Sequence, residues 1–191
     1  VFRLPYSGVS MGWGWGEEDA GGGAPNYHQP FRYSTPTPAQ KNRIEHNHIH
    51  HVMQELQDGG AIYTLGNQPG TIIRANHLHD NRGVPGGIYL DEGSGFIEVT
   101  GNLIHGVPRA LNFNNHAQNR IATCKEHDNV VDQTAQASPL AAKIAGDAGP
   151  AVRRSLLLTL RKRVEAPPGS GTFKVVEEPA VWDAKETAVI V

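Results

Sequence analysis

Short apolar segments alternate with polar turns through the first two thirds of the chain. In stretches such as "TIIRANHLHD" and "GFIEVTGNLIH", apolar side chains alternate with polar ones, which is the two-residue period of a β-strand. Gly, Asn and Asp stand between the segments, and these residues mark turns. The pattern predicts an all-β region made of short strands.

The strand-and-turn unit repeats. Asparagines recur at steps of 29, 26 and 27 residues, and each has an aliphatic residue two positions later; they are Asn47, Asn76, Asn102 and Asn129. A second column, in the same register, consists of Ile62, Ile88 and Leu111. One unit alone cannot bury its apolar face, but units stacked about 4.8 Å apart share a continuous core.

This repeat predicts a right-handed parallel β-helix of about four to five coils. Stacked asparagines can form a hydrogen-bonded ladder along one turn, and asparagine tolerates the left-handed backbone conformation that such turns need. A propeller would need antiparallel blades at a longer period, and a leucine-rich horseshoe would need a Leu-x-x-Leu-x-Leu pattern that is missing. An earlier coil is expected in "YSGVSMGWGWG".

The repeat also divides the chain. We expect coils over residues 1–136, with a Gly/Pro-rich excursion at 17–41. Residues 137–164 are predicted to form a helical cap over the open end of the solenoid. Its first helix would have Ser138 as N-cap and Gly149 as terminator, and the second would follow at 150–164, where "LLLTL" would equally suit a strand. Residues 165–191 are predicted to form a β tail that the pattern does not place.

Composition narrows the class of protein. The 191 residues include 17 Lys and Arg against 19 Asp and Glu, a formal net charge of −2, which offers no field to attract nucleic acid or an anionic membrane. No apolar run is long enough to span a bilayer, and Cys124 alone cannot form an internal disulfide. The opening "VFRLPYSGV" suggests the middle of a longer protein.

Several motifs resemble those of one group of bacterial proteins. "GVSMGWGWG", "DGGAIYTLG", "GGIYLDEGSG" and "AAKIAGDAG" are similar to the C-terminal half of right-handed β-helix proteins of the pectin-lyase-like superfamily. Within it the chain resembles the glycoside hydrolase branch that includes an α-L-fucosidase/xylanase family, over roughly residues 7–150. The resemblance implies cofactor-free hydrolysis of a polysaccharide or oligosaccharide by two acidic residues. It also implies an extracellular or periplasmic location, although no signal peptide stands in this chain.

The same resemblance assigns the catalytic pair to Asp58 of "DGG" and Asp91 of "YLDEG". With Ile62 stacked over Ile88, a straight strand would separate the two aspartates by about 23 Å. Glycoside hydrolysis needs carboxyl groups roughly 5–9.5 Å apart. The pair therefore requires a bend between Asp58 and Ile62, which Gly59-Gly60 makes possible.

Alternation of side chains along the strand places a polar and aromatic patch around Asp91 on the outer face of the coils. The patch is predicted to contain Tyr63, Tyr89, Asp91, Asn112 and Asn114, extended by Trp13 and Trp15, with Glu92 and His79 as further substrate-binding candidates. Aromatic faces with amide and carboxylate groups suit a sugar. The alternative is a packing ladder of tyrosines beside a solvated Asp91-Glu92 turn.

Histidines cluster at His46, His48, His50 and His51, and one repeat position holds His50, His79 and His105. Stacked copies of one position form a column, which is poor geometry for a tetrahedral ion, so no metal site is expected. Two other functions stay open. A polysaccharide lyase would use a base such as Arg82 or Arg109, with calcium. A non-catalytic carbohydrate-binding or structural β-helix fragment would need no carboxylate pair.

Overall fold

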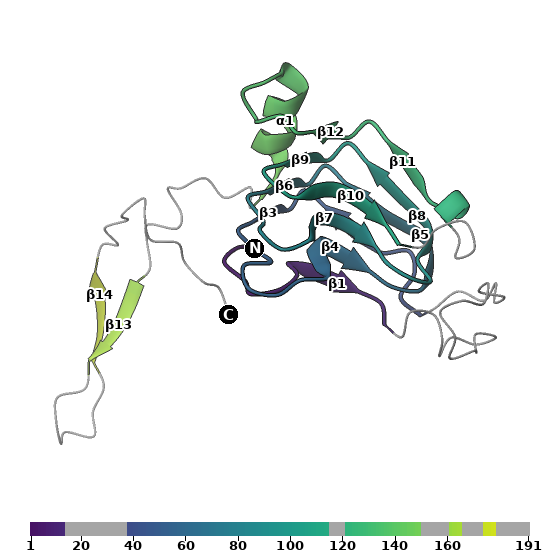
Figure 1. The fold of residues 1–191 in the computed structure, drawn as a ribbon. Helices are drawn as coiled ribbons and strands as arrows, with labels where there is room; N and C mark the ends of the chain where they lie inside the picture. The colour runs from purple at the N-terminus through teal and green to yellow at the C-terminus, as the bar shows by residue number, and fades with distance from the viewer. Residues whose placement is uncertain (14–37, 115–120, 150–160, 166–173, 179–191) are drawn as a thin grey trace. The chain divides into compact units, whose positions relative to one another are not determined.

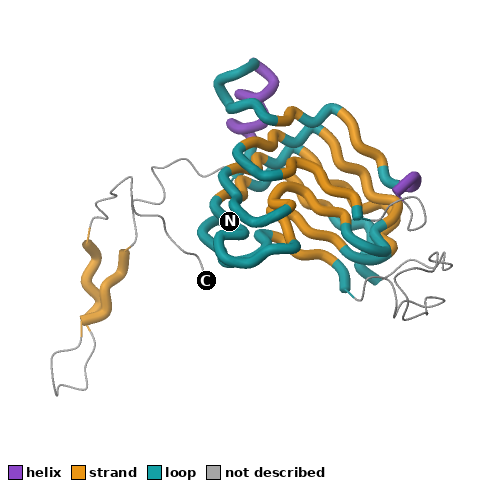
Figure 2. The backbone as a smooth tube through the Cα atoms, viewed as in Figure 1, coloured by secondary structure: helices purple, strands orange, loops and turns teal. Residues whose placement is uncertain are grey.

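Three parallel sheets form the walls of a solenoid (Figure 1). The computed structural model describes residues 1–13, 38–114, 121–149, 161–165 and 174–178. Each coil contributes one strand to each sheet, and strands of consecutive coils lie side by side and pair in parallel (Figure 2). The fold is therefore an all-β parallel β-helix, as predicted, with four strands in each wall.

The three walls are named here sheets 1, 2 and 3. Sheet 1 consists of β1 (Val9–Met11), β4 (Gly59–Thr64), β7 (Pro85–Leu90) and β10 (Arg109–Phe113). Sheet 2 consists of β2 (Arg43–Glu45), β5 (Asn67–Arg74), β8 (Gly95–Thr100) and β11 (Lys125–His127). Sheet 3 consists of β3 (His48–His50), β6 (His77–His79), β9 (Leu103–His105) and β12 (Val130–Val131). A short 3-10 helix, η3 (Ile121–Thr123), precedes β11.

The predicted register is confirmed. Ile62 pairs with Ile88, and Ile88 with Leu111, so one aliphatic column runs through sheet 1. Val9 pairs with Ile62 from the earlier coil that the sequence implied. Inward side chains from all three sheets make one core; its fully buried members include Ile49, Ile62, Ile73, Leu78, Ile88 and Ile104.

The predicted asparagine ladder is present along the turn between sheets 2 and 3. From the second asparagine on, each Oδ1 accepts from the side-chain amide of the asparagine one coil earlier: Asn47 donates to Asn76 at 2.9 Å, and Asn102 donates to Asn129 at 2.9 Å. The amide of Asn102 also donates to the Ile73 carbonyl at 3.0 Å. The ladder therefore satisfies buried backbone groups of neighbouring coils as well as its own side chains.

One detail of the ladder differs from expectation. The left-handed residue of each turn is the one before the asparagine: His46, Ala75, Gly101 and Asp128, with φ between 53° and 61°. The asparagine itself has its side chain directed along the stack, where its carbonyl and amide both find partners. One residue of each turn thus provides the left-handed bend, and the asparagine after it provides the ladder hydrogen bonds.

Close contact between coils explains the glycines of "DGGAIYTLG" and "PGGIYLDEG". A Cβ on Gly60 would lie 2.3 Å from the Gly87 carbonyl oxygen, and a Cβ on Gly87 would lie 2.0 Å from the Ala110 carbonyl oxygen. Any larger residue would push the next coil away. The echo in the sequence therefore contains glycines that the close stacking of the sheet 1 backbones requires.

The helix α1 (Pro139–Asp147) forms where predicted, and Ser138 is its N-cap, accepting from the Ala141 backbone N–H. It packs Ala141 and Ile144 against Leu103 of β9. Leu103 points away from the core, since its neighbour Ile104 belongs to the core cluster. The helix therefore packs against the outer face of sheet 3, and the predicted cap over the open end of the solenoid stays a prediction.

The chain divides after Gly149, and the strands described beyond that point belong to a second unit. The second helix expected over 150–164 is not present at its end, because β13 (Arg161–Glu165) pairs antiparallel with β14 (Lys174–Glu178). The register sets Arg161 opposite Glu178 and Glu165 opposite Lys174. Residues 150–160 and most of the excursion at 17–41 lie outside the described residues. Among those described, no helix has the length and apolar character needed to cross a membrane.

Candidate functional site

Asp58 and Asp91 occupy opposite ends of neighbouring strands. Asp58 directly precedes β4, and its φ of 62° is left-handed. Its backbone N–H donates to the Val84 carbonyl at 2.8 Å, so the chain turns sharply before Gly59. Asp91 directly follows β7, and its N–H donates to the Thr64 carbonyl of the preceding coil at 3.0 Å. The bend that the catalytic pair required is therefore present.

Two tyrosines on neighbouring strands connect the aspartates. Tyr63 and Tyr89 pair in register on β4 and β7, with ring centroids 5.2 Å apart. The Tyr63 hydroxyl donates to Oδ2 of Asp91 at 2.6 Å, and the Tyr89 hydroxyl donates to Oδ1 of Asp58 at 3.3 Å. Both carboxyl groups thus lie against one pair of phenols, and the bend at Asp58 avoids the separation of about 23 Å that a straight strand would give.

The pKa values of the two tyrosines are raised, in part by the nearby carboxylates. Burial is the largest cause that raises the pKa of Tyr89 above its ordinary value. The negative charge of Asp91 raises it further, and that of Asp58 adds a smaller contribution. Burial also raises the pKa of Tyr63, and its hydrogen bond to Asp91 adds to this effect. Both phenols therefore stay protonated and serve as hydrogen-bond donors to carboxylates.

The next coil completes the surroundings of Asp91. Asn114, directly after β10, donates its side-chain amide to Oδ1 of Asp91 at 2.7 Å, so both carboxylate oxygens accept a hydrogen bond. Asn112 pairs in register with Tyr89, and its side-chain carbonyl accepts from the Arg109 guanidinium. The coils before and after Asp91 contribute the side chains that the repeat assigned to them.

The exposure of this group differs from expectation. Tyr63, Tyr89 and Asp91 are only 7%, 5% and 3% exposed, whereas the sequence predicted an open patch. Leu65 joins the two tyrosines in a small cluster separate from the main core. Asp58 is exposed, and Asn112 and Asn114 are half-buried. The predicted residues do meet, but most of the group is covered.

The remaining predicted residues lie elsewhere. Trp13 is 49% exposed, and Trp15 lies outside the described residues. Glu92 is half-buried in the turn after β7, where its carbonyl accepts from the Gly66 N–H at 3.3 Å. His79 lies on β6 of sheet 3, where its ring stacks on other histidines and its Nδ1 contacts Asp80.

Tyr6 belongs to the group and was missed. Its hydroxyl donates to the Asp58 carbonyl at 2.6 Å, and its ring meets the edge of Tyr63 at a centroid distance of 6.5 Å. Burial raises its pKa, and the Asp58 charge raises it further. The signal available in the sequence was its place three residues before Val9, in the coil that precedes Tyr63.

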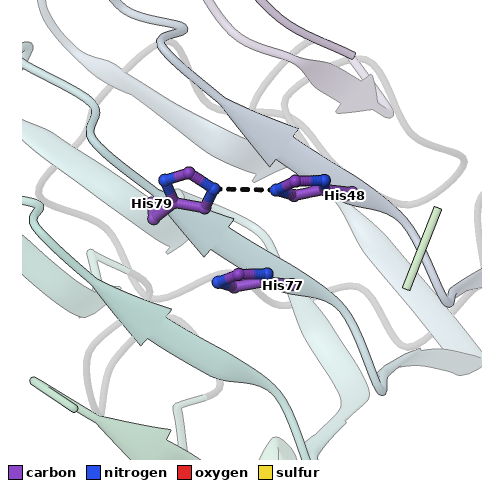
Figure 3. Close-up of side chains that lie close together, drawn as sticks. All are labelled: His48, His77 and His79. Atoms are coloured by element: carbon purple, nitrogen blue, oxygen red, sulfur yellow. Dashed lines mark hydrogen bonds between the residues drawn. The ribbon is translucent and has the colours of Figure 1, made fainter. Parts of the chain in front are cut away.

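A second polar cluster, of histidines, lies on sheet 3 (Figure 3). His48 and His77 stack at a centroid distance of 4.8 Å with ring planes 2° apart, and His79 stacks between His50 and His105 at 4.9 and 5.0 Å. Nε2 of His48 lies 2.7 Å from Nε2 of His79 on the adjacent coil. The sequence predicted a single column, but the structure has two columns side by side.

The histidine cluster disfavours protonation. Burial first, and the neighbouring imidazoles second, together lower the pKa of His48 to about 4 and that of His77 to about 3. Burial and neighbouring histidines likewise lower the pKa of His50 to about 4. These rings are neutral at pH 7 and have lone pairs available for a hydrogen bond or a metal ion.

The fold and these two clusters define a parallel β-helix protein with a buried tyrosine–carboxylate group on one wall and a histidine cluster on another. The chain matches no protein-family model and no curated protein. A solved structure titled "Glycoside hydrolase" is similar to it, with 25% sequence identity and a TM-score of 0.49. The match covers 81% of this chain and 22% of that one, so this chain spans about a fifth of that protein's length.

Proposed function

We propose that this chain is a carbohydrate-active β-helix protein that hydrolyses a glycosidic bond, with Asp58 and Asp91 as its two carboxyl groups. The observation that carries the proposal is their convergence on one tyrosine pair, in which Tyr63 donates to Asp91 and Tyr89 donates to Asp58. The resemblance of "DGGAIYTLG" and "GGIYLDEGSG" to motifs of β-helix glycoside hydrolases supports it.

The surroundings of each carboxyl group suit a different role. Asp91 accepts hydrogen bonds at both oxygens from Tyr63 and Asn114, which suits an ionised nucleophile or base. Asp58 is exposed and accepts one longer hydrogen bond from a side chain, which suits the acid that meets an incoming leaving group. Asp58 would protonate the glycosidic oxygen as its bond to the anomeric carbon breaks, and Asp91 would activate water or attack that carbon directly.

The proposed substrate is a polysaccharide or oligosaccharide. Tyr6 and the half-buried amides of Asn112 and Asn114 border the carboxyl pair, and aromatic and amide groups in this arrangement suit sugar rings and their hydroxyls. Since such substrates lie outside the cytoplasm, the proposal includes an extracellular or periplasmic location.

One observation favours a second candidate function. Asp91 is 3% exposed, beneath tyrosines that are themselves buried, so a sugar reaches its carboxylate only after these side chains move. A tyrosine–aspartate group that only ties coils together would be buried in this way. In that case the chain would be a structural or carbohydrate-binding β-helix without catalysis.

Product analysis separates the candidates. The chain is incubated with a panel of plant and microbial polysaccharides, and reducing ends and unsaturated sugars are both measured. The variants are Asp58→Asn and Asp91→Asn. Asp128→Asn is the matched control, because Asp128 is also exposed and left-handed, with φ 57° against 62° for Asp58.

Each outcome has a distinct meaning. Saturated products whose release falls by about 10²-fold or more in Asp58→Asn and Asp91→Asn, but not in the control, support the hydrolase. Calcium-dependent unsaturated products indicate a lyase. Binding without cleavage supports the second candidate, and neither binding nor cleavage on any substrate contradicts a carbohydrate-active role.

A further inference from the structure

Three imidazoles from two adjacent coils converge on sheet 3. His48 lies on β3, and His77 and His79 lie on β6. One ring nitrogen from each lies within 4.8 Å of the other two. Figure 3 shows the His48 and His77 rings one above the other, with His79 beside them and its nitrogen facing that of His48.

The sequence builds this cluster from two repeat positions. In "HIH" of β3 and "HLH" of β6 the first and third residues point outward, while Ile49 and Leu78 enter the core. Register pairs His48 with His77 and His50 with His79. The outward positions of two stacked strands place four side chains at the corners of a square. Ring nitrogens from neighbouring columns can meet in this arrangement, whereas a single column holds its rings only one above the other.

The orientation of His79 is fixed by a carboxylate. Nδ1 of His79 lies 2.8 Å from Oδ2 of Asp80, so this nitrogen carries the proton and the Nε2 lone pair points toward His48. A carboxylate that holds the second nitrogen of a histidine is the usual outer partner of a metal-bound imidazole. Asp80 thus prepares His79 as a ligand.

We propose that His48, His77 and His79 bind one divalent transition-metal ion of the zinc type, with a water molecule in the fourth position. Zinc lies about 2.0–2.1 Å from imidazole nitrogen, so three tetrahedral ligands would be roughly 3.3 Å apart. The shortest separation here, 2.7 Å, lies below that value, and the 4.8 Å limit on the others lies above it. The His48 and His77 planes are 2° apart, so these two rings would have to tilt toward each other to direct both lone pairs at one ion. If His77 binds through Nε2, it would also give up its contact with Nε2 of His105 at 3.0 Å.

The chemistry of the donors selects the metal. Three neutral imidazoles suit Zn²⁺, Ni²⁺ or Cu²⁺, whereas Ca²⁺ and Mg²⁺ prefer oxygen ligands. Because His48 belongs to one coil and the other two ligands to the next, the ion would clamp two coils together. The cluster is on a different sheet from Asp58 and Asp91, so this site is independent of the proposed hydrolysis.

The test uses the full chain without an affinity tag, stripped with a chelator. Zn²⁺ binding is measured by calorimetry, and Co²⁺ is used as a spectroscopic probe, since tetrahedral Co²⁺ absorbs visible light strongly. The variants are His48→Gln, His77→Gln, His79→Gln and Asp80→Asn. His127→Gln is the control, because His127 is an exposed histidine on sheet 2 that also contacts a neighbouring aspartate.

The wild type and His127→Gln are expected to bind one ion per chain, to give the tetrahedral Co²⁺ spectrum and to melt at a higher temperature with metal. Each histidine variant is expected to lose the spectrum, and Asp80→Asn to bind about 10–100-fold more weakly with all three ligands retained. If a histidine variant fails to fold, Asp80→Asn carries the test. Absence of stoichiometric binding in the wild type, or binding in Asp80→Asn and every folded histidine variant equal to that of the wild type, overturns the proposal.

Discussion

The Tyr63 hydroxyl donates to Oδ2 of Asp91 at 2.6 Å, and both side chains are more than nine-tenths buried. The two residues belong to consecutive coils, so the hydrogen bond crosses from one rung of the solenoid to the next. Hydrogen bonds to charged groups are stronger than neutral ones, and burial makes the loss of one costly. This contact therefore ties the proposed catalytic carboxylate to the stability of the fold.

Tyr63→Phe is expected to destabilise the protein by about 1.5–3 kcal/mol, because it removes the donor and leaves a buried carboxylate oxygen without it. Asn114 still donates to the other oxygen, so the chain should remain folded. Urea unfolding of the wild type and the variant measures the difference. In a double-mutant cycle with Asp91→Asn the two changes should couple, whereas Tyr63→Phe and Asp128→Asn should add within about 0.5 kcal/mol. Simple additivity in the first cycle would contradict the prediction.

Asn102→Ala is expected to cost about 2–5 kcal/mol, because it leaves several buried groups of three coils without partners. Its amide donates to the Ile73 carbonyl and to Asn129, and its Oδ1 accepts from both nitrogens of Asn76. Asn47→Ala is the matched control. Asn47 is half-buried and donates to the Glu45 carbonyl of its own turn, so it should cost clearly less. If chemical denaturation shows equal losses of stability in the two variants, the ladder is not strongest at its centre, and the prediction is contradicted.

Gly87→Ala is expected to destabilise the protein by about 1–3 kcal/mol or more, since the new Cβ would lie 2.0 Å from the Ala110 carbonyl oxygen and push β10 away from β7. Gly146→Ala in α1 should have the opposite sign. A Cβ there meets no atom within 4 Å, and alanine restricts the unfolded chain, so a gain of about 0.4–1 kcal/mol is expected. Melting temperatures of the two variants check the pair, and a destabilised Gly146→Ala would contradict the account of α1.

The sequence predicts the stacking well because equivalent positions of the repeat pair with one another in neighbouring coils. Aligning Asn47 with Asn76 and Ile62 with Ile88 places the same residues together in space as the structure does. The bend at Asp58 was inferred from the need of the proposed catalytic pair, and the left-handed φ of 62° supplies it. Local chemistry also placed the N-cap of α1 at Ser138.

The sequence predicts less well what depends on two columns at once. His48 and His79 occupy different repeat positions, so aligning each column separately does not show that their nitrogens meet. Burial of Tyr63 and Tyr89 escapes the alternation rule, which gives the direction of a side chain but not what covers it. The position of α1 depends on the outward Leu103, an apolar residue that continues the column of His77.

The metal-free protein is expected to lose stability as the pH falls below about 6.5. His48, His50 and His77 have pKa values near 4, 4 and 3 in the folded state, because burial and the adjacent imidazoles oppose their charge. In the unfolded chain they titrate near 6.5. Because the folded values are lowered, their contribution is complete above pH 6.5 and declines as the unfolded chain takes up protons that the folded protein does not.

Other titratable groups face these rings, and they decide how the pH dependence has to be measured. They are the Val1 amino group, His51, His79, Asp80 and His105. His127 acts in the opposite direction, since hydrogen bonds from its ring to Asp128 and Glu98 raise its pKa, so its contribution is present at low pH and declines as the pH rises. Urea midpoints measured with a chelator from about pH 7.5 to about pH 5, in a His127→Gln background, isolate the cluster above the range of ordinary carboxylates. Adding His77→Gln should flatten the profile, and an unchanged slope would show that the cluster does not govern it.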